Sequence, residues 1–486
     1  MSLSSALARA LEHYDAHRAA HIDALKELAR IPSVSFDGYD PENVRRSARA
    51  TAEWLKSSGL ATVEIWQLPD TLPCVFAEWK HPDAAPGKPT VLLYAHHDVQ
   101  PPMRVELWKS PPFEPTEREG RLYGRGTADD KAGIAVHAAS VAAWLKTSGS
   151  LPVNVKILIE GEEEIGSPNL AAYLTHYKER LACDVMVLTD CANYDVGKPS
   201  LTTSLRGLVT MDVRVSALAS PLHSGMWGGP IPDPVQGLCK MLATLSDDDG
   251  RVAVAGLREQ VSAPTAEELA DFRALGMTEK TFREQAGLLE GVALHGNAAT
   301  DPSDLLTRIW REPSFSVNAV EAGLRKSAGN VLLDSAWARL GLRLAPGMDP
   351  VESTRLVVDH LRAHCPWGLR LEVIPEQGAK PWKTRPDHPV FAVAKKSLGE
   401  GYGSEAVCIG CGGTIPFVDT FTAILGDVPA LLVGIEDPYT NAHSENESLH
   451  LGDFDSAVKS QIRFFGDLAE WAASPSVRAT HESPMP

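Results

Sequence analysis

Val91-Leu92-Leu93-Tyr94-Ala95-His96-His97-Asp98-Val99-Gln100 is the stretch that decides the fold, because an apolar run ends here in His-His-Asp. The run predicts a strand that is buried on both faces, which is typical of a parallel sheet covered by helices. Such sheets bind their ligands at the carboxyl ends of the strands. We therefore expect a metal site to form around these imidazoles and this carboxylate.

Strand-like and helix-like segments alternate on both sides of this run. Helices are predicted at residues 7–28, 45–57, 132–145, 170–177 and 454–473, and strands at 62–67, 74–79, 90–99, 153–159, 184–188 and 430–435. The alternation predicts an α/β fold with a mostly parallel sheet that helices cover.

The pattern changes after Ser204 and marks an inserted domain. Strand-like runs at 208–215, 336–344 and 369–374 accompany helix-like stretches at 235–245 and 350–364, with a polar excursion at 247–314. We expect an α+β domain at residues 205–377, inserted into a catalytic domain at residues 1–204 and 378–486.

The charge and cysteine content restrict the class of protein. The 486 residues include 46 Lys and Arg against 63 Asp and Glu, a net charge of -17 that argues against non-specific binding to nucleic acid or anionic membranes. Seven scattered cysteines do not form a disulfide framework. The first residues hold no apolar signal core, and no segment approaches the roughly 20 apolar residues of a membrane span. We expect a soluble cytoplasmic protein.

Acidic and imidazole side chains gather where the predicted strands end. They are His96 and Asp98, Asp129 and Asp130, Glu162 to Glu164, Asp190, and His443. Each group alone has an ordinary explanation: a solvated turn, a helix cap or a surface histidine. Together they supply the roughly five ligands that two divalent ions sharing a carboxylate need, and mixed histidine and carboxylate ligation suits zinc, with manganese or cobalt as alternatives.

A metal-dependent hydrolase also needs a base outside the ligand set. Paired ions polarise a carbonyl and lower the pKa of the water between them, and a nearby carboxylate then takes its proton. The adjacent Glu163 and Glu164 can divide these tasks, one as base and one as ligand. Cys408 and Cys411 lack a second cysteine pair, so we expect them to serve packing.

Three motifs resemble, in order, those of the di-zinc exopeptidases of metallopeptidase family twenty. They are Tyr-Ala-His-His-Asp-Val-Gln-Pro at 94–101, Gly-Arg-Gly-Thr-Ala-Asp-Asp-Lys at 124–131 and Glu-Gly-Glu-Glu-Glu-Ile-Gly-Ser at 160–167. The resemblance extends over nearly the whole chain. The family includes carnosinase-type dipeptidases, succinyl-diaminopimelate desuccinylase and glutamate carboxypeptidase.

The resemblance implies a role for each residue of the cluster. The implied metal ligands are His96, Asp129, Glu164, Asp190 and His443. One ion would take His96 and Asp190, the other Glu164 and His443, and Asp129 would bridge the two. Asp98 would orient His96, and Glu163 would be the general base that deprotonates the metal-bridging water. His97 would not be a ligand.

The insert resembles the family's lid domain, which also makes the dimer contact. Leu-His-Ser-Gly-Met-Trp-Gly-Gly at 222–229 resembles the lid motif whose histidine reaches the partner subunit's active site. This implies a homodimer in which His223 stabilises the oxyanion. Arg343 resembles the lid arginine that holds a substrate carboxylate, with Asn330 assisting, and a strand salt bridge is the alternative for Arg343.

A further loop resembles the family's Gly-Gly-Ser-Ile-Pro substrate loop. It comprises Gly412, Gly413 and Thr414, followed by Ile-Pro. Carnosinase-like members usually carry Arg-Glu before the two glycines, whereas this chain has Gly410 and Cys411. We therefore expect a charged contact to substrate to be missing.

The function implied is that of a hydrolase, a dipeptidase-like metallopeptidase that cleaves amide bonds of dipeptides or short peptides. Asp190, the long lid and the Asp-Asp-Lys motif resemble the dipeptidase branch. An N-acyl-amino-acid deacylase or a carboxypeptidase on the same scaffold is the nearest alternative. A non-catalytic, metal-stabilised binding protein is remote, because Glu163 and all five implied ligands are present.

Overall fold

A computed structural model describes residues 2–82, 88–296, 301–323, 325–384, 386–426 and 428–474. The chain divides into two compact units. Unit 1 comprises Met1–Thr203, Thr384–Ile409 and Phe417–Pro486, and unit 2 comprises Ser204–Lys383 and Gly410–Pro416. Ser204 and residues 378–383 and 410–416, which we expected in the catalytic domain, group with unit 2. Residues 475–486 of that expected domain lie outside the described residues.

The sheet of unit 1 is parallel at its centre and antiparallel at its edges. Its strands, in spatial order, are β1 (Thr62–Trp66), β2 (Cys74–Trp79), β6 (Asn154–Glu160), β3 (Thr90–His96), β7 (Val185–Ala192), β17 (Ala430–Glu436) and β8 (Ser200–Leu205), and β16 (Val407–Cys411) also pairs with β8. β6, β3, β7 and β17 run parallel, whereas β1, β2 and β8 join antiparallel. The expected α/β fold is confirmed, and its sheet is mixed.

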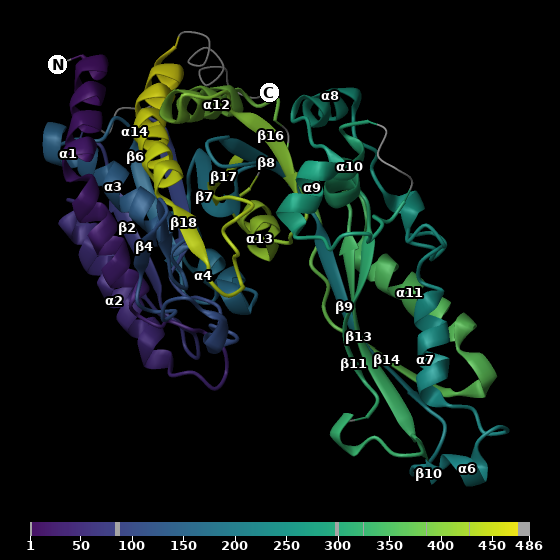
Figure 1. Cartoon of the computed structure of the whole chain (residues 1–486). Coiled ribbons are helices and arrows are strands. Elements are labelled where there is room, and N and C mark those ends of the chain that lie inside the picture. The colour runs from purple at the N-terminus through teal and green to yellow at the C-terminus, as the bar shows by residue number, and fades with distance from the viewer. Residues whose placement is uncertain are drawn as a thin grey trace. The chain divides into compact units, whose positions relative to one another are not determined.

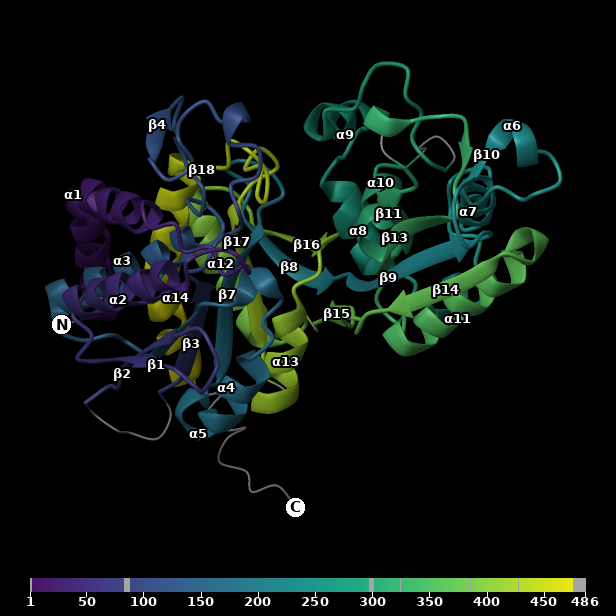
Figure 2. The same ribbon diagram turned by 90° about the horizontal axis from the view of Figure 1, so that it is seen from below.

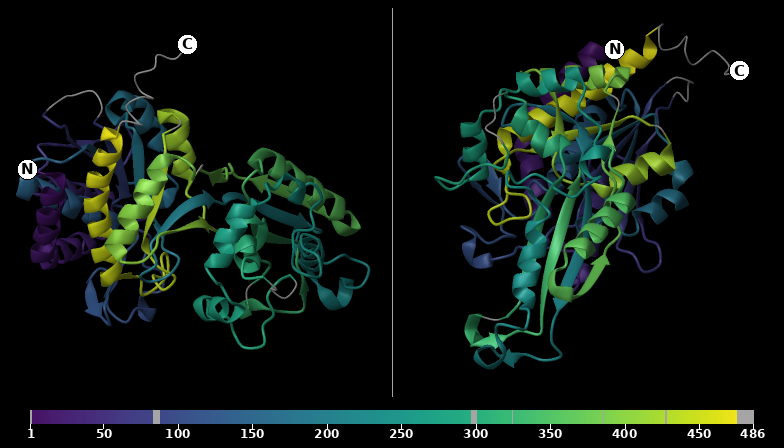
Figure 3. Two further views of the ribbon diagram at one scale, coloured as in Figure 1. Left: turned by 90° about the horizontal axis from the view of Figure 1, so that it is seen from above. Right: turned by 90° about the vertical axis from the view of Figure 1, so that its right-hand side faces the viewer.

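Helices cover this sheet. They are α1 (Leu3–Ala29), α2 (Pro41–Ser57), α3 (Lys131–Ser148), α4 (Leu170–His176), α5 (Lys178–Leu181), α12 (Pro389–Tyr402), α13 (Pro416–Leu425) and α14 (Leu451–Ala473). Figure 1 shows α1, α3 and α14 as neighbours, and Figure 3 shows α12 beside α14. α3 is buried on nearly every face and begins at Asp130, whose side chain accepts the backbone N–H of Gly133. The alanine-rich α3 therefore fits closely between the sheet and the outer helices.

Smaller elements complete unit 1 near the carboxyl ends of the central strands. They are a three-stranded sheet of β4 (Thr116–Arg118), β5 (Arg121–Tyr123) and β18 (Ser448–His450), and the single 3-10 turns η1 (Val105–Leu107) and η2 (Glu163–Ile165). The pairing of β18 with β5 brings the segment after β17 beside the segment before α3. Residues far apart in the sequence therefore meet at this edge.

Unit 2 has its own antiparallel sheet and its own core. The sheet order is β11 (Ser314–Glu321), β13 (Ser335–Leu344), β9 (Gly207–Ser216) and β14 (Arg370–Pro375), and β10 (Leu222–His223) pairs separately with β12 (Val331–Leu332). Buried residues alternate along β9 with half-buried or exposed ones, as its sequence predicts for a half-solvated strand. Two helices, α7 (Pro234–Ala243) and α11 (Pro350–His364), pack on this sheet, and Figure 2 shows α11 along β14.

The remaining elements of unit 2 are short. They are α6 (Ser224–Trp227), α8 (Ala266–Ala274), α9 (Glu279–Ala286), α10 (Asp304–Arg311), β15 (Trp382–Lys383) and the 3-10 turns η3 (Arg258–Gln260), η4 (Arg325–Ser327) and η5 (Pro366–Gly368). The polar excursion at residues 247–314 thus contains short helices joined by loops. Across the part of the chain that the structure describes, no helix combines the length and apolar character that crossing a membrane requires.

Candidate metal centre

The strand that decides the fold delivers one imidazole to the centre. β3 ends at the buried His96, whose Nε2 lies 3.0 Å from Oδ1 of Asp129 and whose Nδ1 lies 3.5 Å from Oδ1 of Asp98. His97 is turned elsewhere, with its Nε2 2.9 Å from the carbonyl oxygen of Pro73. A side chain at Gly161 would collide with this ring, so the glycine leaves room for it.

Asp129 lies between two imidazoles. Its Oδ1 faces His96, and its Oδ2 lies 3.0 Å from Nε2 of His443. One carboxylate oxygen toward each imidazole is the arrangement expected of a ligand shared by two ions. Asp130 has a different task, because it caps α3 and its Oδ2 accepts the backbone N–H of His96 at 3.3 Å.

Three more carboxylates close around these groups. Oε2 of Glu164 lies 3.3 Å from Nε2 of His443, while Oε2 of Glu163 and Oδ1 of Asp190 each lie 3.9 Å from Nε2 of His96. Two sets offer ligand atoms within 4.8 Å of one another, namely His96 with Asp129 and Glu164, and His96 with Glu163 and Asp190. By distance alone, Glu163 is therefore as suitable a ligand as Asp190.

Asp98 positions both halves of the site. Besides facing His96, it accepts the backbone N–H of Glu163 through Oδ1 at 3.2 Å and that of Glu164 through Oδ2 at 3.0 Å. Ser35 donates its hydroxyl to Oδ2 at 2.7 Å. Asp98 thus orients the imidazole and fixes the η2 turn, and sequence reasoning did not identify Ser35 because its segment indicates only a helix break.

Glu447 holds the ligand segments together and was not assigned from the sequence, although it ends the Ala-His-Ser-Glu-Asn-Glu motif. It is fully buried, and its carboxylate accepts the backbone N–H groups of Gly126, Ala128 and Asp129 at 3.0 to 3.1 Å. Arg125 pairs with it at 2.6 Å and donates to the carbonyl oxygen of Ser444 at 3.1 Å. The turn of Asp129 and the loop of His443 are therefore fixed to one buried ion pair.

The His443 loop has an unusual backbone that turns the imidazole toward the carboxylates. Asn441, His443 and Asn446 have φ values of 56°, 60° and 61°, in the left-handed region that asparagine tolerates better than most residues. Asn446 also accepts the backbone N–H of Lys109 at 2.8 Å and donates to the carbonyl oxygen of Leu107 at 3.0 Å. These contacts fix the loop at Asn446, three residues after His443.

The electrostatics of the cluster favour a bound cation. Burial, followed by the charge of Asp190, raises the pKa of Glu163 well above its usual range, and burial raises the pKa of Asp190 to about 6. Burial and the charge of Asp129 likewise raise the pKa of Glu164. Among the described residues, no Lys or Arg forms an ion pair with these four carboxylates. Crowded acids beside two imidazoles fit divalent ions that supply the missing positive charge.

The residues assigned to the insert separate into two groups within unit 2. His223 caps α6 by accepting the backbone N–H of Gly225 at 3.1 Å, and the carbonyl oxygen of Asn330 accepts the backbone N–H of Ser224 at 2.9 Å. Figure 1 shows β10 and α6 beyond one end of the four-stranded sheet. The structure therefore brings Asn330 to the segment of His223.

Arg343 lies at the other end of β13, with the predicted substrate loop. Its Nη1 donates to Oγ1 of Thr414 at 2.7 Å, and the backbone N–H of Gly413 bonds to Sγ of Cys411 at 3.2 Å. No ion pair of Arg343 is present within the described residues, so the strand salt bridge that we considered for it does not form there. Gly412, Gly413 and Thr414 are all half-buried.

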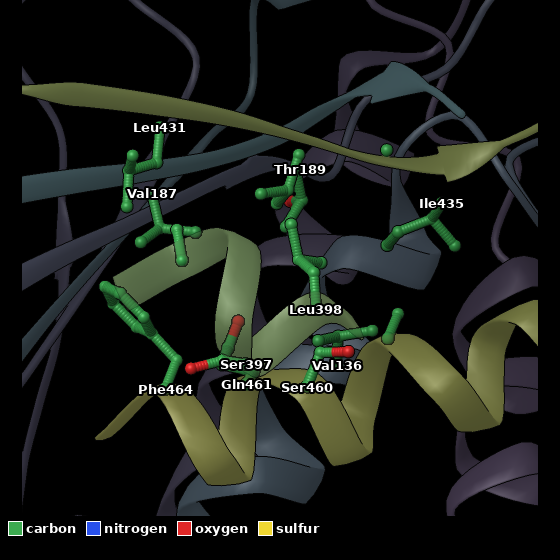
Figure 4. Close-up of a pocket in the computed structure, with 14 residues that line it drawn as sticks. Val136, Val187, Thr189, Ser397, Leu398, Leu431, Ile435, Ser460, Gln461 and Phe464 are labelled. Carbon is green, nitrogen blue, oxygen red and sulfur yellow. The ribbon is translucent and has the colours of Figure 1, made fainter. Parts of the chain in front are cut away.

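A small cavity lies apart from the metal centre, in the apolar core of unit 1. It has a volume of about 40 Å³ and lies between β7 and β17 on one side and α12 and α14 on the other. In Figure 4, Val187 and Leu431 project from the strands, opposite Phe464 on the helix. None of the predicted metal ligands lines it, although Thr189, the neighbour of Asp190, does.

Comparisons with known proteins show which proteins the chain resembles. The model of Peptidase family M20/M25/M40 matches residues 92–467. The chain is 31% identical to the cysteinylglycine-S-conjugate dipeptidase of Corynebacterium striatum over 378 residues, which cover 77% of this chain and 80% of that protein. The structure of human carnosine dipeptidase 1 is similar with a TM-score of 0.82 and 27% identity, over 96% of this chain and 99% of that one. The dipeptidase Dug1p of Saccharomyces cerevisiae gives a TM-score of 0.82 and 27% identity, over 98% and 100%.

Proposed function

Because the chain belongs to peptidase family M20/M25/M40, we propose that it is a dipeptidase with a two-metal centre built on Asp129. The chain is an enzyme, a hydrolase of the metallopeptidase class. The observation that carries the proposal is the position of Asp129, with one carboxylate oxygen 3.0 Å from His96 and the other 3.0 Å from His443. The dipeptidases among its relatives support the substrate class.

We assign five residues as the ligands of two divalent ions, with zinc as the proposed metal. His96 and Asp190 would hold one ion, Glu164 and His443 would hold the other, and Asp129 would be shared between them. When bound, such a pair of ions polarises the carbonyl of the bond to be cleaved and lowers the pKa of a water molecule. Asp98 contacts both the His96 ring and the backbone of the η2 turn, and so fixes their relative position.

Glu163 is the proposed general base. Its carboxylate lies in the cluster but is the one that the assigned ligand set does not use, which leaves it available to accept and return a proton. Glu163 takes a proton from the attacking water and later delivers it to the leaving amine. The Asp98 bonds to the backbone of Glu163 and Glu164 hold base and ligand in a fixed relation.

A homodimer in which His223 acts on the partner's substrate is part of the proposal. Within unit 2, His223 pairs with Val331, which precedes β13, whereas Arg343 is near the end of that strand. The eight residue-to-residue steps from Ser335 to Arg343 span roughly 25 Å of extended strand. His223 and Arg343 of one chain are therefore too far apart to bind the same small substrate, which supports action of His223, with Asn330 beside it, in trans.

Arg343 and the loop of Gly412, Gly413 and Thr414 form the proposed carboxylate subsite of the substrate. Arg343 already donates to Thr414, so strand and loop present their polar groups together. We assign catalysis to unit 1 and the lid role to unit 2, and we place the enzyme in the cytoplasm, which the scattered, odd number of cysteines supports.

Substrate profiling of the metal-loaded protein tests the proposal. Unblocked dipeptides are to be compared with N-acetyl and N-succinyl amino acids at equal concentration, with release of the free amino acid as the measurement. We expect the dipeptides to be hydrolysed and the acyl substrates to remain largely intact. Rapid cleavage of acyl substrates together with inert dipeptides would assign the chain to the deacylases.

A further inference from the structure

Two arginines of unit 2 meet at the substrate loop. Arg343 on β13 stands opposite Ser314 of β11 and donates from Nη1 to Oγ1 of Thr414. Arg206, just before β9, donates from Nη1 to Oγ of the same Ser314 at 3.1 Å and from Nε to the carbonyl oxygen of Gly412 at 2.9 Å. The two guanidinium groups therefore border one loop and share a neighbour on β11.

Neither guanidinium is neutralised by an acidic side chain among the residues that the structure describes. Within the described residues, no carboxylate forms an ion pair with Arg206 or Arg343, and the hydrogen bonds of the two guanidinium groups all go to hydroxyl or carbonyl oxygens. Burial, followed by the charge of Arg343, lowers the pKa of Arg206 to about 10, and burial lowers that of Arg343. Two half-buried like charges side by side are stabilised by an anion that enters from solution.

Donors remain available on both side chains. Arg206 uses Nε and Nη1 for its bonds, and Arg343 uses Nη1. In the part of the chain that the structure describes, Nη2 of each arginine has no hydrogen-bond partner. A guanidinium edge with unused N–H groups is matched to a carboxylate, which it binds through paired hydrogen bonds.

We propose that Arg206 and Arg343 select dipeptides whose C-terminal residue carries two carboxylates, an aspartate or a glutamate. Arg343 binds the α-carboxylate, and Arg206 binds the side-chain carboxylate of the same residue. This assignment rests on the proposed dipeptidase function and names the substrate class of that site. Arg206 is the specificity-determining residue, because a neutral side chain in the same place leaves its guanidinium without a counter-charge.

The test is a ratio of kcat/KM values for matched dipeptides, alanyl-glutamate against alanyl-glutamine and alanyl-aspartate against alanyl-asparagine. A ratio is unaffected by the fraction of folded enzyme, so it stays informative if a variant is partly unfolded. We expect the wild type to favour the acidic member of each pair by about tenfold or more, the gain from one charge-assisted hydrogen bond. Arg206→Gln brings the ratio close to one, mainly through KM of the acidic substrate, and Arg206→Lys retains part of the preference.

Arg214→Gln is the matched control, since Arg214 is an exposed arginine of β9 that donates to Ser335 at 3.3 Å. This variant keeps the wild-type ratio. Equal hydrolysis of acidic and neutral dipeptides by the wild type, or an unchanged ratio in Arg206→Gln, overturns the two-arginine pocket and leaves the dipeptidase proposal intact. Failure to hydrolyse any of the four dipeptides overturns the dipeptidase proposal, and the pocket with it.

Discussion

Oε1 of Glu447 accepts the backbone N–H of Asp129 at 3.1 Å, although the two residues are 318 positions apart in the sequence. The bond fixes the turn that carries Asp129, the proposed bridging carboxylate. The same glutamate pairs with Arg125, which in turn holds the carbonyl oxygen of Ser444 next to His443. The spacing between the two halves of the proposed centre therefore depends on one buried ion pair.

Glu447→Gln should weaken both the fold and the centre. Each carboxylate oxygen of Glu447 accepts hydrogen bonds from two donors. In the glutamine variant, the amide NH₂ replaces one oxygen and faces two N–H groups that it cannot accept. The positive charge of Arg125 also loses its buried counter-charge. We expect the free energy of unfolding to fall by about 2 to 4 kcal/mol, together with weaker metal binding by calorimetry. Glu445→Gln in the same loop is the control, because its partner Arg104 is exposed, and its effect should be small. Equal effects of the two variants would contradict the role of Glu447.

Glu163→Gln should remove catalysis without removing metal. Loss of a general base lowers kcat by about 10² to 10⁴, whereas a lost ligand lowers the metal content. This variant therefore distinguishes a general base from a metal ligand, which the 3.9 Å distance between Glu163 and His96 does not. Elemental analysis should still find two ions per chain. A matched Glu162→Gln variant should keep most activity, because that carboxylate binds Leu72 and Asn169 instead.

Hybrid dimers test the action of His223 in trans. Chains carrying His223→Ala and chains carrying Glu163→Gln should each be nearly inactive as homodimers. In a mixed dimer, one site combines an intact Glu163 with an intact His223 from the partner, so activity should recover to roughly half per mixed dimer if the two sites act independently. Tagged chains allow mixed dimers to be purified before the assay. Verified mixed dimers without activity would place His223 in its own chain's site or outside catalysis.

His21 on α1 should make the fold sensitive to acid. Burial, followed by the charges of His13 and His17, lowers the pKa of His21 from 6.5 to about 4. Between these pH values the unfolded chain binds a proton that the folded chain does not, so stability falls as the pH drops. The contribution is about 2 to 3 kcal/mol over this range.

Denaturation of the wild type and His21→Gln between pH 7 and 4 measures this contribution. The variant should show a smaller decrease in the free energy of unfolding with falling pH. The exposed His176→Gln should follow the wild type. Parallel curves for wild type and His21→Gln would show that His21 does not contribute to the acid sensitivity.

The central strands and the chemistry of the centre were predictable, because both leave local signals. The strand before His96 is a continuous apolar run, and its final residues are the ones that face the site. The run after Asp130 is rich in alanine and forms the buried α3. The antiparallel edges were not predicted. An apolar run predicts a strand but not its direction, which depends on the neighbouring strand with which it pairs.

The supporting contacts of the site were not predictable in the same way. These contacts, made by Glu447, Ser35 and Arg206, go mainly to backbone groups or to residues distant in the sequence. A backbone group can belong to any residue type, so such a contact cannot be recognised from the sequence of the partner segment. The assignment of Glu163 and Glu164 to separate tasks came from resemblance to a family, and distances alone do not separate them. The helices within residues 247–314 were missed because their exposed faces are polar.

Activity as a function of bound metal tests the two-metal centre most directly. Metal-free protein is titrated with Zn²⁺ while bound ions per chain and hydrolysis of an unblocked dipeptide are recorded together. The shared position of Asp129 predicts no hydrolysis without metal and a maximum when two ions are bound per chain. Full hydrolysis by the metal-free protein, or a maximum at one bound ion that a second does not change, would contradict it.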